Sequence, residues 1–304
     1  MTNFYTMTLI DGKQTSQQIR DEIAQQVAFI KEKGQKIPHL AAILVGNNPA
    51  SEAYVRNKVK DCEAVGFGST LVRFDTDVTE EELLSEVEKI NQNDDIDGLI
   101  VQLPLPDHIT SEKVTFAIRP EKDVDGFHPI NVGRMAKGLP SFIAATPLGI
   151  IQLLERYEIA TEGKRCVVIG RSDIVGTPMS LLMSRKGYPG NCTVTVCHSR
   201  TQDMAAITRQ ADILIAAIGR ARFVTADMVK EGAVVIDVGI NRVEDSQRRS
   251  GYALVGDVDF EAVAEKCSYI TPVPGGVGPM TRAALLYNTL LAAQGKVYQT
   301  ARLR

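Results

Sequence analysis

Apolar residues recur along the chain with two alternating spacings. Within residues 16–33 they stand three or four positions apart, from Ile19 to Ile30, which predicts an amphipathic helix that ends at Gly34. The next run, 39–46, is continuously apolar and predicts a strand covered on both faces. This alternation of helix and strand continues through most of the chain and predicts a mainly parallel β-sheet packed against helices.

Four further elements follow in the first half of the chain. They are a helix over 51–65, a strand over 70–75, a helix over 79–91 and a strand over 97–106. Thr79 and Glu82 stand at the spacing of a capping box, which marks the start of the second helix. Pro104 and Pro106 have no backbone N–H to donate, so we expect the strand ladder to end at them.

The second half begins with a long segment, 119–145, that has no periodic pattern; long loops in compact domains are often functional. A helix over 146–158 follows, with Thr146 as its cap and Pro147 in its first turn. Later strands are expected over 164–170, 192–197, 212–219 and 233–240. A surface loop is expected over 241–253, a glycine-proline hinge over 272–279 and a closing helix over 280–295.

Composition narrows the class of protein. The chain of 304 residues is 44% hydrophobic and 23% charged, which is typical of a soluble globular protein with about two domains. A net charge of −3 argues against a nucleic-acid or anionic-membrane partner. Five cysteines without C-x-x-C spacing suit a reducing compartment, and the four histidines lack metal-ligand spacing. No signal peptide or membrane-spanning run is visible, so we expect a cytosolic protein.

Residues 167–178, VVIGRSDIVGTP, combine a strand end with two glycines before a predicted helix. Gly170 permits a tight turn, and Gly176 lets the helix N-terminus approach a diphosphate. The segment departs from G-x-G-x-x-G because Arg171 and Ser172 replace the second glycine. A turn that binds no ligand is therefore as compatible with the segment as a dinucleotide site. A P-loop is excluded, since no Gly-Lys pair follows a glycine at the required spacing.

The end of the next predicted strand distinguishes between cofactors. A dinucleotide fold usually carries an acidic residue there, which bonds the ribose 2′-hydroxyl of NAD. This strand is followed by Ser199 and Arg200 and has no carboxylate. A hydroxyl and a cation suit the 2′-phosphate of NADP, with Arg171 as a second guanidinium. The alternative interpretation is that both arginines are solvated surface residues.

Four polar residues are open to a structural or a functional interpretation. Gln102 lies in the apolar strand end VQLPLP, either as a core amide bonded to backbone or as an amide facing a cleft at the carboxyl end of the sheet. Asp123 and Asp125 belong to the turn DVDGFHP and are turn formers by default. Lys58 taken alone is more often a surface lysine with a buried stem.

Lys58 shares one helical stripe with Ser51 and Tyr54, at positions i, i+3 and i+7. The helix that carries this stripe, the strand end at Gln102 and the turn at Asp125 are all expected on the mouth side of one sheet. Their grouping favours a functional role over three independent structural ones.

Eight motifs occur in the order found in one enzyme family. They are SEAYVRNK, DGLIVQLPLP, KDVDGFHPIN, TPLGIIQLLE, GRSDIVGTP, VIDVGINR, LVGDVDF and TPVPGGVGPMT. Over nearly its whole length the chain resembles the methylenetetrahydrofolate dehydrogenase/cyclohydrolase family, and VQLPLP and PVPGGVGPMT are the motifs most specific to it. The resemblance implies two α/β domains around a cleft, the second a Rossmann-like dinucleotide-binding domain with a mainly parallel sheet.

The implied domains are a folate-binding catalytic domain over 1–148 and an NADP-binding domain over 149–278, with the closing helix, 279–304, packed back onto the first. From the resemblance we expect a cytoplasmic homodimer that acts in one-carbon metabolism and purine biosynthesis. Its expected ligands are tetrahydrofolate derivatives and NADP, and we expect no nucleic-acid or membrane partner.

The resemblance also implies roles for individual residues. The implied catalytic residues are Lys58 for acid–base chemistry, Gln102 to adjust the lysine, Tyr54 to pack on the pterin-side rings and Asp125 to hold the pterin. The same four bind substrate, together with Pro274, Gly275 and Gly276. The implied cofactor-binding residues are Gly170, Arg171, Ser172, Gly176, Ser199, Arg200 and Ile240, and no metal is implied. Ala144-Ala145 stands where the family commonly has Pro-Cys, which argues against a role for a thiol there.

The implied reaction oxidises 5,10-methylenetetrahydrofolate with NADP+ and hydrolyses the methenyl product to 10-formyltetrahydrofolate. The two nitrogens that flank the methylene carbon stabilise the cation left when hydride departs. Hydrolysis needs proton movement, and a partly buried amine beside a neutral amide, as Lys58 beside Gln102, can be uncharged part of the time. Tyr54 offers the flat substrate a face to stack on. Two alternatives stay open: a non-catalytic NADP-binding sensor, and another two-domain oxidoreductase such as an amino-acid dehydrogenase.

Overall fold

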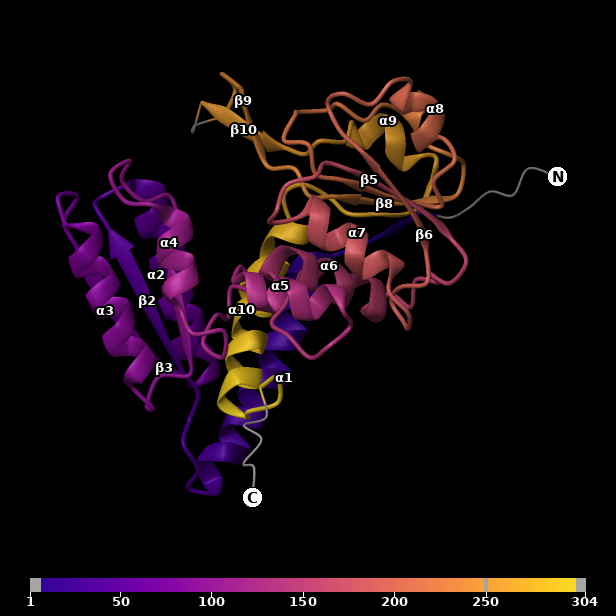
Figure 1. Cartoon of the computed structure of the whole chain (residues 1–304). Helices are drawn as coiled ribbons and strands as arrows, with labels where there is room; N and C mark the ends of the chain where they lie inside the picture. Colours follow the sequence, from indigo (N-terminus) through magenta and orange to yellow (C-terminus); the bar gives the residue numbers. More distant parts are fainter. Residues whose placement is uncertain (1–6, 249–250, 299–304) are drawn as a thin grey trace. The chain divides into compact units, whose positions relative to one another are not determined.

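The computed structural model describes residues 7–248 and 251–298, and it divides into two compact units. The six-stranded unit consists of Thr146–Thr281 and the residues up to Ser16. The three-stranded unit consists of Gln17–Ala145 and the residues from Arg282 onward. Each unit is an α/β structure around a parallel sheet, so the predicted fold class is confirmed (Figure 1).

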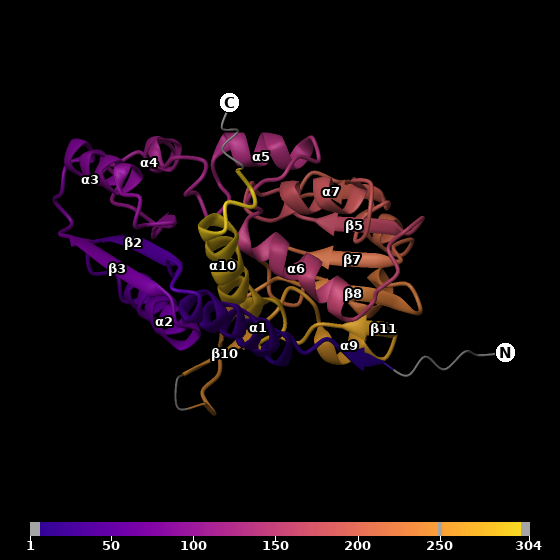
Figure 2. The ribbon, with the colours of Figure 1, turned by 90° about the horizontal axis from the view of Figure 1, so that it is seen from below.

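The three-stranded unit has the strand order β3-β2-β4, with all strands parallel. Figure 2 shows α3 and α4 on one face of this sheet and α2 on the other. Its elements are most of α1 (Gly12–Glu32), then β2 (His39–Val45), α2 (Pro49–Val65), β3 (Gly68–Phe74), α3 (Glu80–Gln92), β4 (Gly98–Val101), α4 (Ser111–Ala117), α5 (Pro129–Ala136) and most of α10 (Val277–Ala293). Every residue of β2 after His39 is buried, which confirms the predicted strand covered on both faces.

Local signals explain where these helices begin and end. The predicted capping box at α3 is confirmed: Thr79 Oγ1 accepts from the N–H of Glu82 at 3.1 Å, and the Glu82 carboxylate accepts from the N–H of Thr79 at 3.0 Å. Asn48 caps α2 by accepting from two backbone N–H groups, and Pro49 follows in the first turn. At the other end, Gly66 takes the left-handed conformation with φ 82°.

The six-stranded unit has the strand order β1-β11-β8-β7-β5-β6, again all parallel. Its elements are β1 (Thr8–Leu9), α6 (Ala145–Arg156), β5 (Arg165–Ile169), α7 (Gly176–Ser184), β6 (Thr193–Cys197), α8 (Met204–Thr208), β7 (Ile213–Ala216), η1 (Ala226–Met228), β8 (Ala233–Asp237), β9 (Asn241–Glu244), β10 (Tyr252–Val255), α9 (Phe260–Ala264) and β11 (Cys267–Ile270). Helices α6 and α7 lie on one face of the sheet, and α8 and α9 lie on the other (Figure 1). Alternating strand residues such as Val167, Leu214 and Val235 form the apolar core under the second pair.

Two segments predicted as irregular contain regular structure. Residues 119–145 include α5, whose eight residues make about two turns and are too few to show a helical period. Its cap is His128, which accepts from the N–H of Ile130 and is not a residue type that usually signals a helix start. Residues 241–253 include most of an antiparallel hairpin, β9–β10. Neither strand has a buried residue, so the apolar alternation that reveals a strand is absent.

The helix predicted over 146–158 is α6, but it begins at Ala145, so Thr146 lies in its first turn instead of capping it. At the N-terminus, β1 pairs with β11, which groups the residues up to Ser16 with the six-stranded unit and not with the domain expected over 1–148. This pairing joins segments from opposite ends of the sequence, and β1 is too short to be visible as a pattern. Among the described residues, no helix has the length and apolar character needed to cross a bilayer.

Candidate functional site

Lys58 and Gln102 meet at the carboxyl edge of the three-stranded sheet. The N–H of Gln102 donates to the carbonyl oxygen of Ile43 at 2.9 Å, which extends the β2–β4 ladder one residue beyond Val101. Lys58 Nζ donates to Gln102 Oε1 at 3.3 Å, and both side chains are half-buried. Gln102 Nε2 donates to the carbonyl oxygen of Leu103 at 2.7 Å. This second bond turns the amide so that its oxygen faces the lysine.

Tyr54 lies one helical turn before Lys58 on α2 and is 56% exposed. The spacing of the two residues puts them on the same side of the helix. Val55 and Cys62 of the same helix are fully buried and hold α2 on its unit. The arrangement therefore presents an open aromatic face next to a positioned amine, which suits a flat ring that stacks.

The two aspartates of the DVDG turn have different surroundings. Asp123 is buried and accepts from the N–H of His128 at 2.8 Å, the N–H of Phe127 at 3.3 Å and Asn131 Nδ2 at 2.8 Å. Burial outweighs these donors and raises the pKa of Asp123 to about 6. Asp125 is half-buried, and within residues 7–248 and 251–298 its carboxylate makes no hydrogen bond or ion pair. Asp123 thus shapes the turn, and Asp125 is left available for a ligand.

The predicted cofactor residues lie at the carboxyl edge of the six-stranded sheet. In the parallel pair β5–β6, Ile169 stands opposite Cys197, so the turns after the two strands are neighbours. Gly170 and Arg171 follow β5, and Ser199 and Arg200 follow β6. The chain passes from β5 to β6 on one side and then to β7 on the other side of β5. Such a switch point is where open parallel sheets bind nucleotides.

The two glycines of this turn are required by packing. Gly170 has φ 125°, and a Cβ at this residue would lie 2.1 Å from the carbonyl oxygen of Ala217. A Cβ at Gly176, the first residue of α7, would lie 2.3 Å from the carbonyl oxygen of Gly170. The helix N-terminus therefore sits directly on the turn, and this geometry fits a dinucleotide diphosphate.

The same edge carries unpaired positive charge. Arg171, Ser199 and Arg200 are exposed, and in the described parts of the chain neither guanidinium has a carboxylate partner. Ser172 Oγ accepts from the N–H groups of Val175 and Gly176, which closes the loop between the glycines. Two free guanidinium groups and a hydroxyl at neighbouring strand ends fit a phosphate.

A small cavity of about 130 Å³ in the six-stranded unit brings together residues predicted from separate motifs. Ile240, which is 57% exposed, lines it together with Pro274, Gly275 and Gly276. The motif VIDVGINR and the motif TPVPGGVGPMT therefore line the same cavity. Sequence order alone does not place them side by side.

Two buried aspartates that the sequence analysis did not single out hold the loops around this cavity. Asp237 accepts from the N–H groups of Gly239, Asp257 and Val258 at 2.9–3.0 Å. Asp257 in turn accepts from four donors, at Ile218, Gly219, Arg220 and Asn241. Burial raises the pKa of Asp237 to about 6.

Glycines allow these carboxylates to fit. A Cβ at Gly256 would lie 1.7 Å from Asp237 Oδ2, and one at Gly239 would lie 2.2 Å from Asp257 Oδ1. Each aspartate therefore packs on a glycine that belongs to the other motif. The available signal was an acidic residue close to a glycine in both VIDVGINR and LVGDVDF, inside otherwise apolar sequence.

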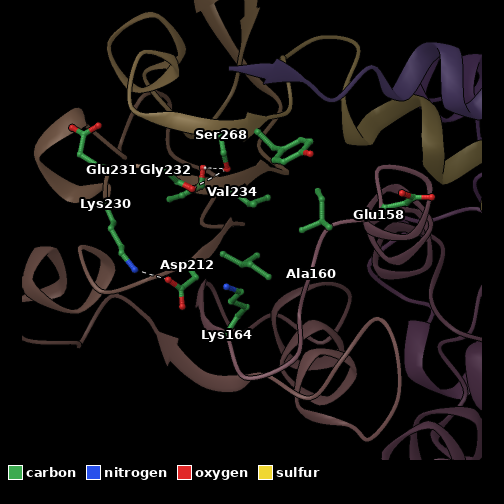
Figure 3. Close-up of a pocket in the computed structure, with 13 residues that line it drawn as sticks. Glu158, Ala160, Lys164, Asp212, Lys230, Glu231, Gly232, Val234 and Ser268 are labelled. Atoms are coloured by element: carbon green, nitrogen blue, oxygen red, sulfur yellow. Dashed lines mark hydrogen bonds and ion pairs between the residues drawn. The ribbon is translucent and has the colours of Figure 1, made fainter. Parts of the chain in front are cut away.

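A second cavity, of about 420 Å³, lies at the opposite, amino-terminal edge of the same sheet (Figure 3). Inside it Lys230 donates to Asp212, and Ser268 Oγ donates to the carbonyl oxygen of Gly232 at 2.8 Å. None of the predicted site residues lines this cavity. The predicted cofactor residues lie instead at the carboxyl edge after β5 and β6, which is the edge where parallel sheets bind nucleotides.

Metal chemistry has no candidate centre in residues 7–248 and 251–298, where no three His, Cys, Asp or Glu side chains gather as a metal site. All five cysteines are free and buried, and burial raises the pKa of the Cys62 thiol to about 12. These thiols therefore pack inside the two units.

These features are those of a class of α/β proteins with two parallel-sheet units, one of which has a glycine turn that fits a dinucleotide. The family model of the tetrahydrofolate dehydrogenase/cyclohydrolase catalytic domain matches residues 10–125, and that of the NAD(P)-binding domain matches residues 144–297. The chain belongs to the tetrahydrofolate dehydrogenase/cyclohydrolase family. The family predicted from the sequence motifs is confirmed.

Relatives and solved structures agree with this assignment over nearly the whole length of the chain. The bifunctional protein FolD of Bacteroides fragilis is 61% identical over 293 residues, which cover 96% of this chain and 100% of that protein. The structure of the bifunctional FolD dehydrogenase/cyclohydrolase from Campylobacter jejuni is similar with a TM-score of 0.89 and 49% identity, over 96% of this chain and 100% of that one. The Trypanosoma brucei enzyme, solved with NADP and an inhibitor, gives a TM-score of 0.89 and 38% identity, over 96% and 99% of the two chains.

Proposed function

We propose how individual residues of this chain carry out the two activities of its family. The enzyme oxidises 5,10-methylenetetrahydrofolate to 5,10-methenyltetrahydrofolate with NADP+, and it hydrolyses this product to 10-formyltetrahydrofolate. The observation that carries the residue assignment is the hydrogen bond between Lys58 Nζ and Gln102 Oε1, with Tyr54 open beside it. It joins an acid–base group to a stacking face at one sheet edge.

The glycine turn and its neighbours hold the cofactor. Gly170 and Gly176 bring the N-terminus of α7 onto the turn, where it accommodates the diphosphate, and Ser172 closes the loop between them. Arg171, Ser199 and Arg200 bind the 2′-phosphate, for which they offer two guanidinium groups and a hydroxyl. Ile240 contributes an apolar contact. When bound, NADP+ accepts the hydride from the methylene carbon.

The side chains that bind folate in the three-stranded unit are Tyr54, Lys58, Gln102 and Asp125. Tyr54 stacks against its ring system. Asp125 accepts hydrogen bonds from the N–H groups of the pterin, which is the ligand chemistry that a half-buried, unpartnered carboxylate fits. Gln102 restrains Lys58 beside the reacting carbon. Pro274, Gly275 and Gly276, which line the small cavity, are proposed as the substrate-binding residues of the six-stranded unit.

Oxidation needs orientation but no proton donor, because the substrate nitrogens stabilise the cation. Hydrolysis depends on Lys58. As a neutral amine, Lys58 takes a proton from the attacking water. At the same time the oxygen of that water bonds to the methenyl carbon. Lys58 then gives a proton to N5 as the carbon–N5 bond breaks. The intermediate's hydroxyl proton leaves as the formyl C=O forms, so one proton is released overall.

Gln102 suits this role because it is neutral. A carboxylate at the same position would form an ion pair with Lys58 and hold the lysine in its charged form. The amide oxygen only accepts a hydrogen bond, and the contact of Gln102 Nε2 with Leu103 keeps that oxygen aimed at the lysine. Lys58 is therefore positioned by a group that carries no charge of its own.

The test is direct. Purified protein is mixed with 5,10-methylenetetrahydrofolate and NADP+, and the absorbance of the methenyl product is followed while it forms and decays. We expect formation that requires NADP+ and decay faster than in buffer alone. If no methenyl product forms, the dehydrogenase assignment fails; if product forms but decays at the buffer rate, the cyclohydrolase assignment fails.

We further propose a cytoplasmic homodimer whose product supplies one-carbon units, purine biosynthesis included. Strand β6 is an edge strand whose outer side pairs with no other strand of the described chain, so it offers a surface for a second copy. The five free cysteines suit a reducing compartment. Light scattering would measure the mass in solution, and a monomer mass would contradict the dimer.

A further inference from the structure

Asn288 on α10 joins two segments of the three-stranded unit that are distant in sequence. It is 1% exposed and lies in the apolar run LLYNTLL. Asn288 Nδ2 donates to the carbonyl oxygen of Val124 at 2.8 Å and to that of Ile143 at 2.9 Å. A buried amide is costly unless its donors are used, and here both N–H groups are used. The residue after Val124 is Asp125.

The backbone on both sides of Asp125 is held in place. Val124 is bound by Asn288, and Asp123 is held by its three donors. Gly126 has φ 75°, and a Cβ there would lie 2.6 Å from the backbone nitrogen of Ala144. The carboxylate of Asp125 has no partner in the described chain, although its backbone is this closely restrained. Restrained backbone with a free acceptor is the arrangement that orients a ligand.

The same helix also contacts α2. Arg282 of α10 donates through Nε and Nη2 to both carboxylate oxygens of Asp61. Arg20 Nη1 of α1 donates to the same carboxylate at 3.1 Å, and Asp61 is buried. Asp61 stands three positions after Lys58 on α2, so the bidentate contact restrains the rotation of the helix that carries the lysine.

We propose that α10 is a positioning helix: Asn288 sets the backbone that carries Asp125, and Arg282 acts through Asp61 to set the orientation of α2 and Lys58. This inference rests on the proposed roles of Lys58 and Asp125. The two contacts come from one rigid helix, so they keep the acceptor for the pterin and the acid–base group at a fixed spacing.

The first experiment replaces Asn288 by leucine, which keeps the branching at Cγ and has no donor. We expect KM for 5,10-methylenetetrahydrofolate to rise roughly tenfold, as for a lost or displaced hydrogen bond, with KM for NADP+ unchanged. Thr289→Val is the matched control. Thr289 is adjacent and fully buried, and in the described parts of the chain its hydroxyl bonds only the carbonyl oxygen of Leu285 within α10. An equal rise of KM in both variants would overturn the role of Asn288.

A double-mutant cycle shows whether Asn288 acts through Asp125. Asn288→Leu should raise KM in the native background and add almost nothing in the Asp125→Ala background. Additive effects would overturn the inference while leaving the role of Asp125 intact. If Asp125→Ala leaves KM unchanged, the proposed role of Asp125 fails, and the positioning role of Asn288 fails with it.

Arg282 is tested by the hydrolysis of 5,10-methenyltetrahydrofolate. Arg282→Met should slow it about tenfold, and it should have no further effect when Lys58 is already replaced by methionine. The control is Arg56→Met on the exposed side of α2.

Because Arg282→Met leaves the buried charge of Asp61 without this partner, the double variant Asp61→Asn with Arg282→Gln is made as well. This neutral pair keeps hydrogen-bonding capacity and should recover hydrolysis; native rates in Arg282→Met, or no recovery in the pair, would overturn the inference.

Discussion

Lys58 Nζ lies 3.3 Å from Gln102 Oε1, although 44 positions separate the two residues along the chain. The contact exists because β4 pairs directly with β2, and α2 follows β2 at the carboxyl edge of the sheet. The residues that follow the strands of a parallel sheet lie at the same edge. The lysine that follows β2 therefore meets the amide at the end of β4, the neighbouring strand in the sheet.

Replacing Lys58 by methionine should abolish cyclohydrolase activity, because the substitution keeps the length of the side chain and removes its proton-transferring group. Positioned acid–base groups typically supply ~10²–10⁴-fold in rate, so hydrolysis should fall by this factor. Dehydrogenase activity should fall less, since hydride transfer needs no proton donor. The measurement is the decay of 5,10-methenyltetrahydrofolate against the buffer rate.

Lys60→Met provides the control for this prediction, because Lys60 is exposed on the same helix and has no partner among the described residues. It should hydrolyse the substrate like the native enzyme. Native hydrolysis by Lys58→Met would instead return Lys58 to the role of a surface lysine.

Replacing Gln102 by leucine should leave the fold intact, because the backbone N–H that extends the β2–β4 ladder is retained. The lysine would lose the oxygen that restrains it, and the leucine would lower the local polarity. We therefore expect slower hydrolysis and a displaced pH–rate profile. Identical profiles for variant and native enzyme would argue against the role of Gln102.

Replacing Arg171 by alanine should weaken NADP+ binding far more than NAD+ binding. A charge-assisted contact to the 2′-phosphate contributes ~1–3 kcal/mol, and NAD+ has no such phosphate. Dissociation constants for both cofactors provide the measurement, and Lys186→Ala, beyond the far end of α7, is the control. An equal loss with both cofactors would contradict the assignment of the 2′-phosphate site.

Asp237 predicts a pH dependence of stability. Burial raises its pKa to about 6 in the folded protein, above the ordinary value of 3.8. Below pH 3.8 the carboxyl group is protonated in both the folded and the unfolded state, and its contribution to the free energy of unfolding is fully present. As the pH rises towards 6, the carboxyl group ionises first in the unfolded chain, so this contribution to stability is lost. The loss is on the order of 2–3 kcal/mol.

Asp237→Asn removes this titration. It should also lower the melting temperature, because the amide nitrogen would face one of the N–H groups that donate to the carboxylate in the native protein. The difference in melting temperature between native protein and variant should be largest near pH 4 and smaller at pH 6.5. A difference that does not change with pH would show that Asp237 titrates normally in the folded state.

The sequence by itself determined the family and the elements that bury one face or both. The spacing of apolar residues encodes which side of an element is buried, and capping residues act within one turn, so 79–91 and 39–46 were predicted close to their observed limits. Elements without a buried period, such as α5 and the β9–β10 hairpin, were not predictable in this way.

Only the tertiary structure decided how neighbouring polar residues divide their roles. Asp123 and Asp125 are indistinguishable as turn residues in the sequence. The fold buries Asp123 against Asn131 and leaves Asp125 unpartnered in the described chain. The contact that restrains the turn comes from Asn288, 164 positions after Val124. Hydrogen bonding at such separations depends on strand register and helix packing, which side-chain spacing along the chain does not encode.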